Sequence, residues 1–293
     1  MCAQQKWNKR SALQRRPRGD TVMTAALPFA LNHMAAPALP LDAFFALAAS
    51  LGISMVEIRN DIAGSAILDG TNSQQVKALA EKYGLTIISI NALQRFNEWN
   101  ETRADEAHEL ITYARDCGAK ALVLVPVNDG SGKEDRVRQA NLRQALSALK
   151  PMLDTAAIIG LVEPLGFEVC SLRSKAEAAE AIREISGEGT FRLVHDTFHH
   201  HLSGEDRFLA DMTGLVHVSG VTDGNLAVAD MRDPDRVLIG AGDRLDNEGQ
   251  IRRLRAEGYA GPLSFEPFAP SVHELADPAN ALRESMNYLR VRS

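Results

Sequence analysis

The amino-acid sequence predicts an α/β fold of the (β/α)8 TIM-barrel class, in which parallel strands alternate with helices around a closed sheet. From Leu27 onward, a short apolar run with strand-like residues is repeatedly followed by a longer segment with helical periodicity. Runs such as Ala121–Val125 are apolar at every position, which is typical of strands buried on both faces of a parallel sheet. A doubly wound sheet is the competing architecture, but no G-x-G-x-x-G follows the first expected strand.

The expected elements alternate along the chain in a regular order. The strands are Leu27–Asn32, Met55–Arg59, Leu85–Asn91, Ala121–Pro126, Ile158–Glu163, Phe191–Asp196, Leu215–Ser219 and Leu263–Glu266. The helices are Leu41–Leu51, Ser73–Tyr83, Arg103–Cys117, Glu134–Ala156, Ser174–Ile185, Glu205–Asp211, Asn247–Glu257 and Pro278–Leu289. Helix-stop signals precede several strands, at Gly52, Gly84, Gly118, Gly160 and Gly258. The expected helix N-caps are Ser73 and Ser174.

The composition is that of an ordinary globular protein with a large core. Of its 293 residues, 45% are hydrophobic and 24% are charged. The formal net charge of −6 argues against a general affinity for nucleic acid or for an anionic membrane. No apolar run reaches the roughly 18 residues that span a bilayer. Cys2, Cys117 and Cys170 form no CxxC pair, so we expect a reducing, cytoplasmic location.

The N-terminal stretch differs from the rest of the chain. Residues 1–22 contain six lysines and arginines against a single acid, Asp20, and no apolar segment follows them as in a secretory signal. A transit peptide would also be basic, but this stretch lacks a clear amphipathic helix. We expect a disordered basic extension over residues 1–22, or a natural start at Met23. Residues 23–293 are then expected to form a single TIM-barrel domain.

Isolated polar side chains stand in or directly after otherwise apolar strands, close to their ends. They are Asn32, Glu57, Asn91, Glu163, Asp196, His217 and Glu266. In a barrel, the C-terminal ends of all strands meet at one mouth, where active sites are found. Carboxylates that converge on such a low-dielectric site repel each other unless a cation or shared protons intervene.

Four of these residues belong to four successive strands and predict a metal site. They are Glu163, Asp196, His217 and Glu266. Three carboxylates and one imidazole suit a divalent ion such as Mn²⁺, Zn²⁺, Mg²⁺ or Co²⁺. The alternative is an accidental set of strand-end acids that pair with arginine or lysine. That alternative explains any one residue well, but four in succession less well, so we expect one divalent metal ion.

Polar residues beyond the strands are candidates for binding a ligand at the mouth. His199 follows Asp196 by three residues and could reach the same site. Arg236 lies in the long irregular stretch of residues 220–246, which could cover the mouth and bind substrate oxygens; the alternative is a solvated surface charge. His195 points to the opposite face of its strand from Asp196, which favours a packing role.

These residues occur in short motifs that resemble the xylose-isomerase-like TIM-barrel superfamily, which contains sugar isomerases, epimerases and endonuclease IV. The motifs are Val56-Glu-Ile-Arg59, Asn91-Ala-Leu93, Glu163-Pro-Leu-Gly166, Val194-His-Asp-Thr-Phe-His199, Val216-His-Val218, Asp235-Arg236 and Ser264-Phe-Glu-Pro267. The resemblance covers the chain from Leu27 to the C-terminus. Within the superfamily it is greatest to 2-keto-myo-inositol (inosose) isomerases.

The resemblance implies roles for individual residues. It assigns the metal to the same four side chains, and it makes His199 and Arg236 substrate-binding residues. Asn91 and Glu57 complete the expected substrate-binding set. One departure concerns the position after the strand-7 histidine motif, where related isomerases often carry an acid and this chain has Ser219.

The activity implied by the resemblance is isomerisation of 2-keto-myo-inositol to 1-keto-D-chiro-inositol, in inositol catabolism, by enediolate proton transfer. Glu163 and Glu266 would be the catalytic pair that moves the proton. The alternatives on the same scaffold are a ketose 3-epimerase, a hydroxypyruvate isomerase and an inosose dehydratase. The expected partner is a small polyol ketone or ketose, with a possible homodimer and neither nucleic acid nor membrane.

Two alternatives come from other classes of protein. A DNA-repair enzyme like endonuclease IV would bind three metals and need more histidines at strand ends, where this chain offers Glu57 and Asn91. It would also need a basic surface for phosphates. A non-catalytic sugar-binding barrel with a structural metal predicts ligand binding without proton exchange.

Overall fold

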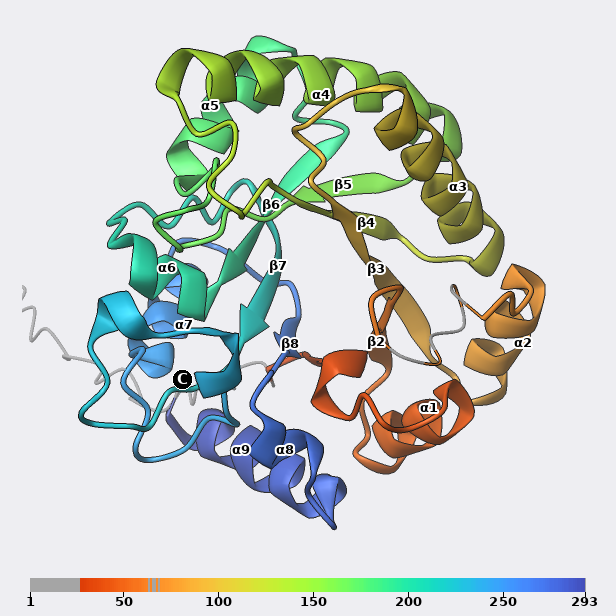
Figure 1. Cartoon of the computed structure of the whole chain (residues 1–293). Coiled ribbons are helices and arrows are strands. Elements are labelled where there is room, and N and C mark those ends of the chain that lie inside the picture. The colour runs from red at the N-terminus through yellow and green to blue at the C-terminus, as the bar shows by residue number, and fades with distance from the viewer. Residues whose placement is uncertain (1–26, 63, 65–66, 68, 293) are drawn as a thin grey trace, which may run out of the picture.

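The computed structural model describes residues 27–62, 64, 67 and 69–292, in which eight parallel strands form a closed barrel (Figure 1). The strands are β1 Phe29–Asn32, β2 Met55–Arg59, β3 Thr86–Gln94, β4 Ala121–Val125, β5 Ile159–Val162, β6 Phe191–Asp196, β7 Thr213–Val218 and β8 Leu263–Phe265. Each strand pairs with its neighbours in sequence, and β8 closes the sheet by pairing with β1. The predicted TIM-barrel fold is therefore confirmed.

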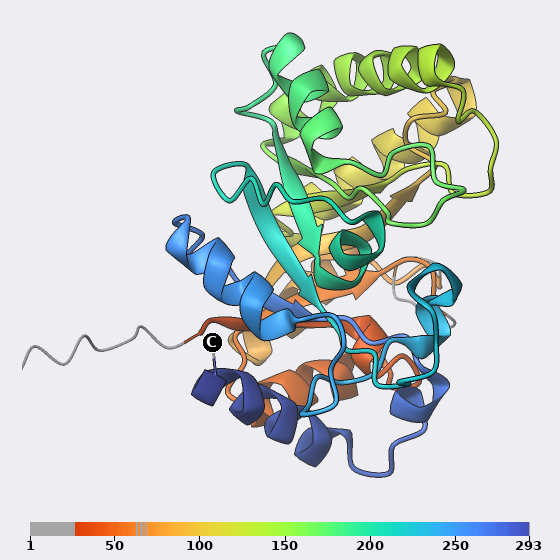
Figure 2. The same ribbon diagram turned by 90° about the vertical axis from the view of Figure 1, so that its left-hand side faces the viewer.

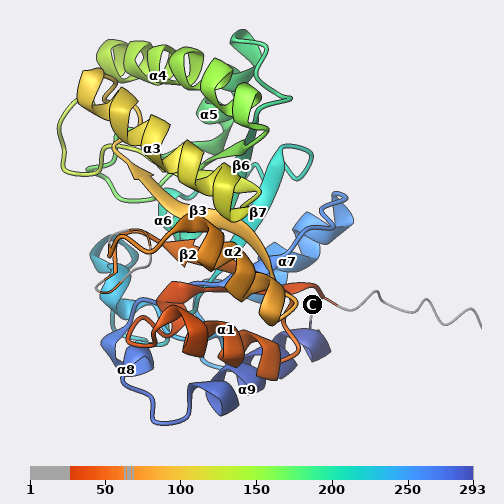
Figure 3. The same ribbon diagram turned by 90° about the vertical axis from the view of Figure 1, so that its right-hand side faces the viewer.

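Helices surround the strands on the outside of the barrel (Figures 1 and 2). They are α1 Leu41–Ser50, α2 Ser73–Lys82, α3 Glu101–Cys117, α4 Asp135–Ala156, α5 Lys175–Glu184, α6 Thr197–Ser203, α7 Asn247–Ala256, α8 Pro270–His273 and α9 Pro278–Arg292, with short 3-10 turns η1 His33–Ala35, η2 Val228–Asp230 and η3 Asp233–Asp235. The loop of residues 220–246 and α8 lie at one end of the barrel, and the C-terminus of α9 lies at the other (Figures 2 and 3). The end with the loop and α8 is the mouth of the barrel.

One predicted helix is wrong. The segment Glu205–Asp211 is not helical, and the helix of this unit is α6, directly after β6. Asp196 caps α6, because its Oδ1 accepts hydrogen bonds of 2.8 and 3.1 Å from the backbone amides two and three residues later. Gly204 ends the helix with a positive φ of 65°. A strand-end carboxylate thus starts a helix that periodicity alone placed too late.

Two local signals were also misassigned. Helix α2 begins at Ser73, but its N-cap is Asn72. The Asn72 side chain accepts a hydrogen bond of 2.8 Å from the backbone amide of the second helical residue. Gly160 is not a helix stop, since it lies inside β5. A Cβ at that position would lie 2.6 Å from the Phe191 ring, so close packing explains the glycine. The preceding helix α4 ends at Ala156 and is capped by Ala157, which has a positive φ of 54°.

The side chains of the strands alternate between two apolar cores, and this alternation positions the polar residues. The outer core lies between strands and helices, and a smaller inner core fills the barrel with Ala121, Val123, Leu161, Val194 and Leu215. Two residues further along β5, β6 and β7, the inward face carries Glu163, Asp196 and His217. The period of two therefore directs these side chains into the mouth.

His195 lies on the outward face of β6, and its predicted packing role is confirmed. Its Nδ1 lies 2.7 Å from Lys175 Nζ, and its Nε2 lies 2.8 Å from Gln250 Oε1, with all three residues buried. Burial lowers the pKa of Lys175 to about 7. Above that pH, a neutral amine and a neutral imidazole complete a satisfied hydrogen-bonded chain between α5, β6 and α7.

This buried amine predicts a stability that rises with pH. Unfolded Lys175 keeps its proton up to about its ordinary pKa of 10.5, whereas the folded residue loses it near 7, so the unfolded chain binds more protons between these values. The free energy of unfolding should then increase by up to about 1.4 kcal/mol per pH unit above pH 7. Urea unfolding between about pH 6.5 and 9.5 measures this slope. Lys175→Met should lack that component, and an equal slope in both proteins would contradict the assignment.

Two expectations concern the N-terminus and membranes. The predicted basic extension over residues 1–22, and the start at Met23, lie outside the described residues and stay predictions. Among the helices of the described ranges, none combines the length and the apolar composition needed to cross a bilayer.

Candidate metal centre

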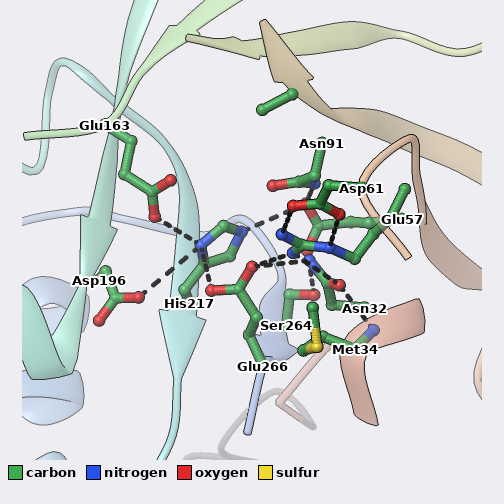
Figure 4. Close-up of polar contacts among 12 residues, drawn as sticks. Asn32, Met34, Glu57, Asp61, Asn91, Glu163, Asp196, His217, Ser264 and Glu266 are labelled. Atoms are coloured by element: carbon green, nitrogen blue, oxygen red, sulfur yellow. Dashed lines mark hydrogen bonds and ion pairs between the residues drawn. The ribbon is translucent and has the colours of Figure 1, made fainter. Parts of the chain in front are cut away.

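Four side chains from β5, β6, β7 and β8 or their C-terminal ends meet at one nitrogen of His217 (Figure 4). His217 Nδ1 lies 2.8 Å from Glu163 Oε1, 3.1 Å from Glu266 Oε2 and 3.9 Å from Asp196 Oδ2. One potential ligand atom from each residue lies within 4.8 Å of the others, and all four residues are buried. The fold thus brings together all the residues that the sequence nominated as metal ligands.

This set of donors fits a divalent cation. A ring nitrogen carries at most one proton, so His217 Nδ1 cannot donate to three carboxylates at once. Three buried carboxylates that approach the same point repel each other unless positive charge lies between them. A cation held by these oxygens and the nitrogen would satisfy all of them, and the donor types suit Zn²⁺, Mn²⁺, Mg²⁺ or Co²⁺.

The second nitrogen of His217 faces Glu57, on the side away from the three acids (Figure 4). His217 Nε2 lies 3.2 Å from Glu57 Oε2. That oxygen also accepts hydrogen bonds from Ser89 Oγ at 2.5 Å and Asn91 Nδ2 at 2.8 Å, and Ser264 Oγ donates to the other oxygen. An Nε2–H that donates to Glu57 leaves the Nδ1 lone pair for a metal, as in carboxylate–histidine–metal arrangements.

We expect Glu57→Gln to weaken metal binding without removing any ligand. Loss of the negative charge behind the imidazole should lower its basicity, and changes of this kind typically reduce metal affinity by about 10–100-fold. Zn²⁺ titration with a competing chelator measures the dissociation constant. The matched control is Glu98→Gln, at a partly exposed acid that pairs with Arg95, and it should leave the dissociation constant unchanged. Equal affinities of Glu57→Gln and the unaltered protein would show that Glu57 does not support His217.

Arg236 comes from the loop after β7, yet the residue is only 1% exposed. Its Nη2 lies 2.6 Å from Asp196 Oδ2 and 3.1 Å from Glu266 Oε2. Its Nε donates to Ser219 Oγ at 3.0 Å, so Ser219 helps to hold the arginine in place. The loop therefore inserts a cation beside two of the expected ligands instead of presenting it to solvent.

Arg59 is a site residue that belongs to one of the sequence motifs but had no predicted role. Its Nη1 lies 2.7 Å from Glu266 Oε1, and its Nη2 lies 2.7 Å from Asp61 Oδ2. Asn32 Nδ2 donates to the same Glu266 oxygen at 3.1 Å. A signal was available, because Arg59 follows Glu57 by two residues and so lies on the same inward face of β2. A buried cation there needs an acidic partner.

The two glutamates differ in their electrostatic surroundings. Burial raises the pKa of Glu163, and the nearby His217 only partly opposes it. Burial acts in the same direction on Glu266, but His217, Arg236 and Arg59 outweigh it and lower the pKa of Glu266. Burial opposes the charged form of His217, but the surrounding carboxylates outweigh burial and raise its pKa, and Glu266 contributes most among them. A proton and a metal therefore compete for the same imidazole nitrogen.

A cavity of about 220 Å³ adjoins this cluster at the mouth. The residues that line it include Arg59, Asn91, Glu163, His199, Arg236 and Glu266. Buried His199 Nδ1 has no hydrogen-bond partner among the described residues, so it is available to a ligand. Three expected substrate-binding residues thus share a cavity with both expected catalytic carboxylates. Glu57 is fully buried behind His217 and is not among the residues that line the cavity, and its expected contact with substrate stays a prediction.

Comparison with known proteins agrees with this architecture. A family model described as xylose isomerase-like TIM barrel matches residues 45–292. The chain belongs to the xylose isomerase-like TIM-barrel family. A solved structure of a xylose isomerase domain containing protein from Salmonella typhimurium is 38% identical to it, with a TM-score of 0.81 over 89% of this chain and 95% of that chain. The resemblance to the superfamily seen in the sequence motifs is confirmed.

More distant structures share the fold of this xylose isomerase-like barrel. The IOLI protein, solved with a zinc atom, is 18% identical, with a TM-score of 0.81 over 91% of this chain and 99% of that chain. D-allulose 3-epimerase from Methylomonas sp., in complex with D-allulose, is 16% identical, with a TM-score of 0.69 over 92% of this chain and 98% of that chain. Identities this low establish the fold alone. No match was found among curated proteins.

Proposed function

We propose that this barrel is a divalent-metal-dependent isomerase that moves a proton on the carbon beside the ketone of a polyol, with an inosose as its substrate. The observation that carries the proposal is the convergence of Glu163 and Glu266, from the ends of β5 and β8, on one imidazole nitrogen in a buried mouth. Two groups that can each hold a proton close to the same substrate are well suited to proton transfer between neighbouring carbons. Isomerases and epimerases of sugars in this family agree with that chemistry.

The metal would be held by Glu163, Asp196, His217 and Glu266. When bound, a divalent ion polarises a ketone and makes the adjacent C–H bond more acidic. The two glutamates would remove the proton and return it to the neighbouring carbon. His199, through its unpartnered Nδ1, and Arg236 would hold substrate oxygens, and such orientation can contribute several kcal/mol to lowering a barrier.

The contacts of the two glutamates suggest different parts in this transfer. The described contacts of Glu266 include Arg59, Arg236, Asn32 and His217. For Glu163, the polar contact described is that with His217. A carboxylate with fewer donors around it loses less on taking up a proton. We therefore favour Glu163 as the residue that accepts the first proton and Glu266 as its partner.

The charges around the cavity support an uncharged substrate. The charged side chains that line it are Arg59, Asp61, Glu163, Asp233, Arg236 and Glu266. Both arginines are already in salt bridges with these acids or with Asp196. A divalent cation would balance the remaining negative charge, and no lining cation would be left for a substrate carboxylate. This favours a polyol ketone such as an inosose over an acid such as hydroxypyruvate.

Proton NMR in D₂O tests the proposal directly. scyllo-Inosose (2-keto-myo-inositol) is incubated with metal-loaded enzyme and, as a control, with enzyme stripped by EDTA. We expect metal-dependent signals of 1-keto-D-chiro-inositol and deuterium at the α-carbon. An inosose that binds but exchanges no α-proton would indicate a sugar-binding barrel and contradict an isomerase. If inososes neither bind nor exchange, ketohexoses assayed in the same way would distinguish a 3-epimerase.

A further inference from the structure

A second, larger cavity opens beside the one at the metal centre. It has a volume of about 620 Å³, against about 220 Å³ for the inner cavity. Asn128, Phe167 and Asp233 line both cavities, so the two cavities adjoin each other. The inner volume is below the usual range for sites that bind small molecules, about 300–1,000 Å³, whereas the outer one lies within it. The mouth therefore has space for a ligand larger than the inner cavity alone can hold.

The outer cavity has apolar side chains that the fold leaves exposed. Val169, between β5 and α5, and Val228, in η2, are 44% and 39% exposed and belong to loops far apart in sequence. Large apolar side chains with this exposure are few among the described residues, and two of them line the same cavity. Phe167 lies at the boundary, with its ring edge-on to His199 of the inner cavity. Such a wall would pack against the face of a ring.

The walls of the outer cavity are held in place by hydrogen bonds. Arg173 donates to the backbone oxygens of Gly166 and Leu202 and so ties the loop after β5 to α6. Arg232 donates to backbone oxygens of its own loop, at Ala229 and Met231. A pocket whose walls are fixed before binding loses less entropy when a ligand enters.

The boundary between the cavities contains an unsatisfied polar atom. Asn128 Oδ1 is buried and has no hydrogen-bond partner among the described residues. Its side chain lines both cavities, so an oxygen that joins the two halves of a ligand, or a hydroxyl beside it, would complete its hydrogen bonding. The charged residues of the outer wall, Glu168, Arg173, Arg232 and Asp233, balance one another, which favours a neutral group.

We propose that the outer cavity is a subsite for a neutral ring joined through oxygen to the keto-polyol, so that the preferred substrates are polyol ketones that carry a sugar or an aromatic group on one oxygen. This inference rests on the proposed function, because it places the ketone-bearing ring in the inner cavity. The appended ring would pack against Phe167, Val169 and Val228, and the linking oxygen would lie at Asn128.

The test compares a free ring with the same ring carrying a substituent. The probes are scyllo-inosose, its 5-O-benzyl ether and its 5-O-β-D-glucoside, the last two substituted opposite the ketone. For metal-loaded enzyme, we measure the dissociation constant by calorimetry and kcat/KM for α-proton exchange. We expect at least one substituted probe to bind about tenfold or more tighter than the free ring, because burial of a second ring has an effect of that size on affinity. The benzyl and glucosyl arms distinguish an aryl from a sugar subsite.

Substitutions that fill the outer cavity provide the second readout. Val169→Trp and Val228→Trp should each lower the affinity for the substituted probe, relative to that for the free ring, several-fold. Val137→Trp is the matched control, since Val137 is 44% exposed on α4 and lines neither cavity, and it should leave the ratio unchanged.

Each outcome bears on the inference separately from the proposed function. Tight binding of a substituted probe without α-proton exchange would support the subsite and contradict the isomerase. Exchange with equal ratios in all variants would support the isomerase and overturn the subsite. Failure of every probe to bind overturns the subsite. If the tryptophan variants change only the oligomeric state in size-exclusion chromatography, the cavity is a protein interface and the inference is wrong.

Discussion

Glu163→Gln should reduce the rate of α-proton exchange by about 10²–10⁴-fold, the usual contribution of a positioned general base. Glutamine keeps the size of the side chain and an oxygen for a metal, but it cannot take up the proton. Because His217 is the polar contact described for Glu163, the variant should disturb little else. The measurement is deuterium incorporation at the α-carbon under single-turnover conditions, with metal content determined in the same samples.

The control for this result is Glu180→Gln, an exposed acid on α5 that should exchange at the unaltered rate. Metal content matters because loss of exchange with loss of metal would reflect a missing ligand. Full activity of Glu163→Gln with metal in place would rule out Glu163 as the base and leave Glu266 as the remaining carboxylate of the proposed pair.

Arg59→Ala should lower the free energy of unfolding by about 3–5 kcal/mol, since removal of one partner from a buried salt bridge leaves the other charge uncompensated. Arg59 and Glu266 are both nearly inaccessible, at 6% and 4% exposure of their side chains. Denaturation in urea with EDTA present measures the change. Added divalent metal should reduce the difference, because a cation at the cluster compensates Glu266 in place of the guanidinium.

The matched control is Arg115→Ala, whose pair with Asp116 is exposed and should contribute little to the free energy of unfolding. A loss from Arg59→Ala no larger than that of the control would mean that Glu266 is compensated by Arg236 and His217 alone. In that case Arg59 would have no structural role at the site.

The sequence was sufficient for the barrel and for the acids because both follow from simple periodicities. An apolar strand buried on both faces and a polar side chain at its end are local patterns, and the geometry of a barrel brings the ends together. His217 and Glu266 could therefore be placed side by side from the sequence alone. The same reasoning placed His195 on the outer face.

The remaining features depend on contacts between distant segments. Arg236 was expected at the mouth, but its burial against Asp196 depends on the path of a loop, which has no periodicity to reveal it. Arg59 and Glu57 acquire their partners from β3, β7 and β8, so their roles appear only when the strands are in register. The misplaced helix has a similar cause, because the capping oxygen of Asp196 overrides the periodicity of the following segment.

The two oxygens of Asp196 have different structural roles, and this limits which residues can replace it during evolution. One oxygen starts α6, the helix that carries His199, and the other lies against Arg236 in the cluster of acids. A relative that does not bind the proposed metal would still need a capping side chain here, so asparagine or serine would be tolerated and alanine would not. In relatives of this protein, asparagine or serine at the equivalent position would therefore mark descendants that kept the architecture and lost the chemistry.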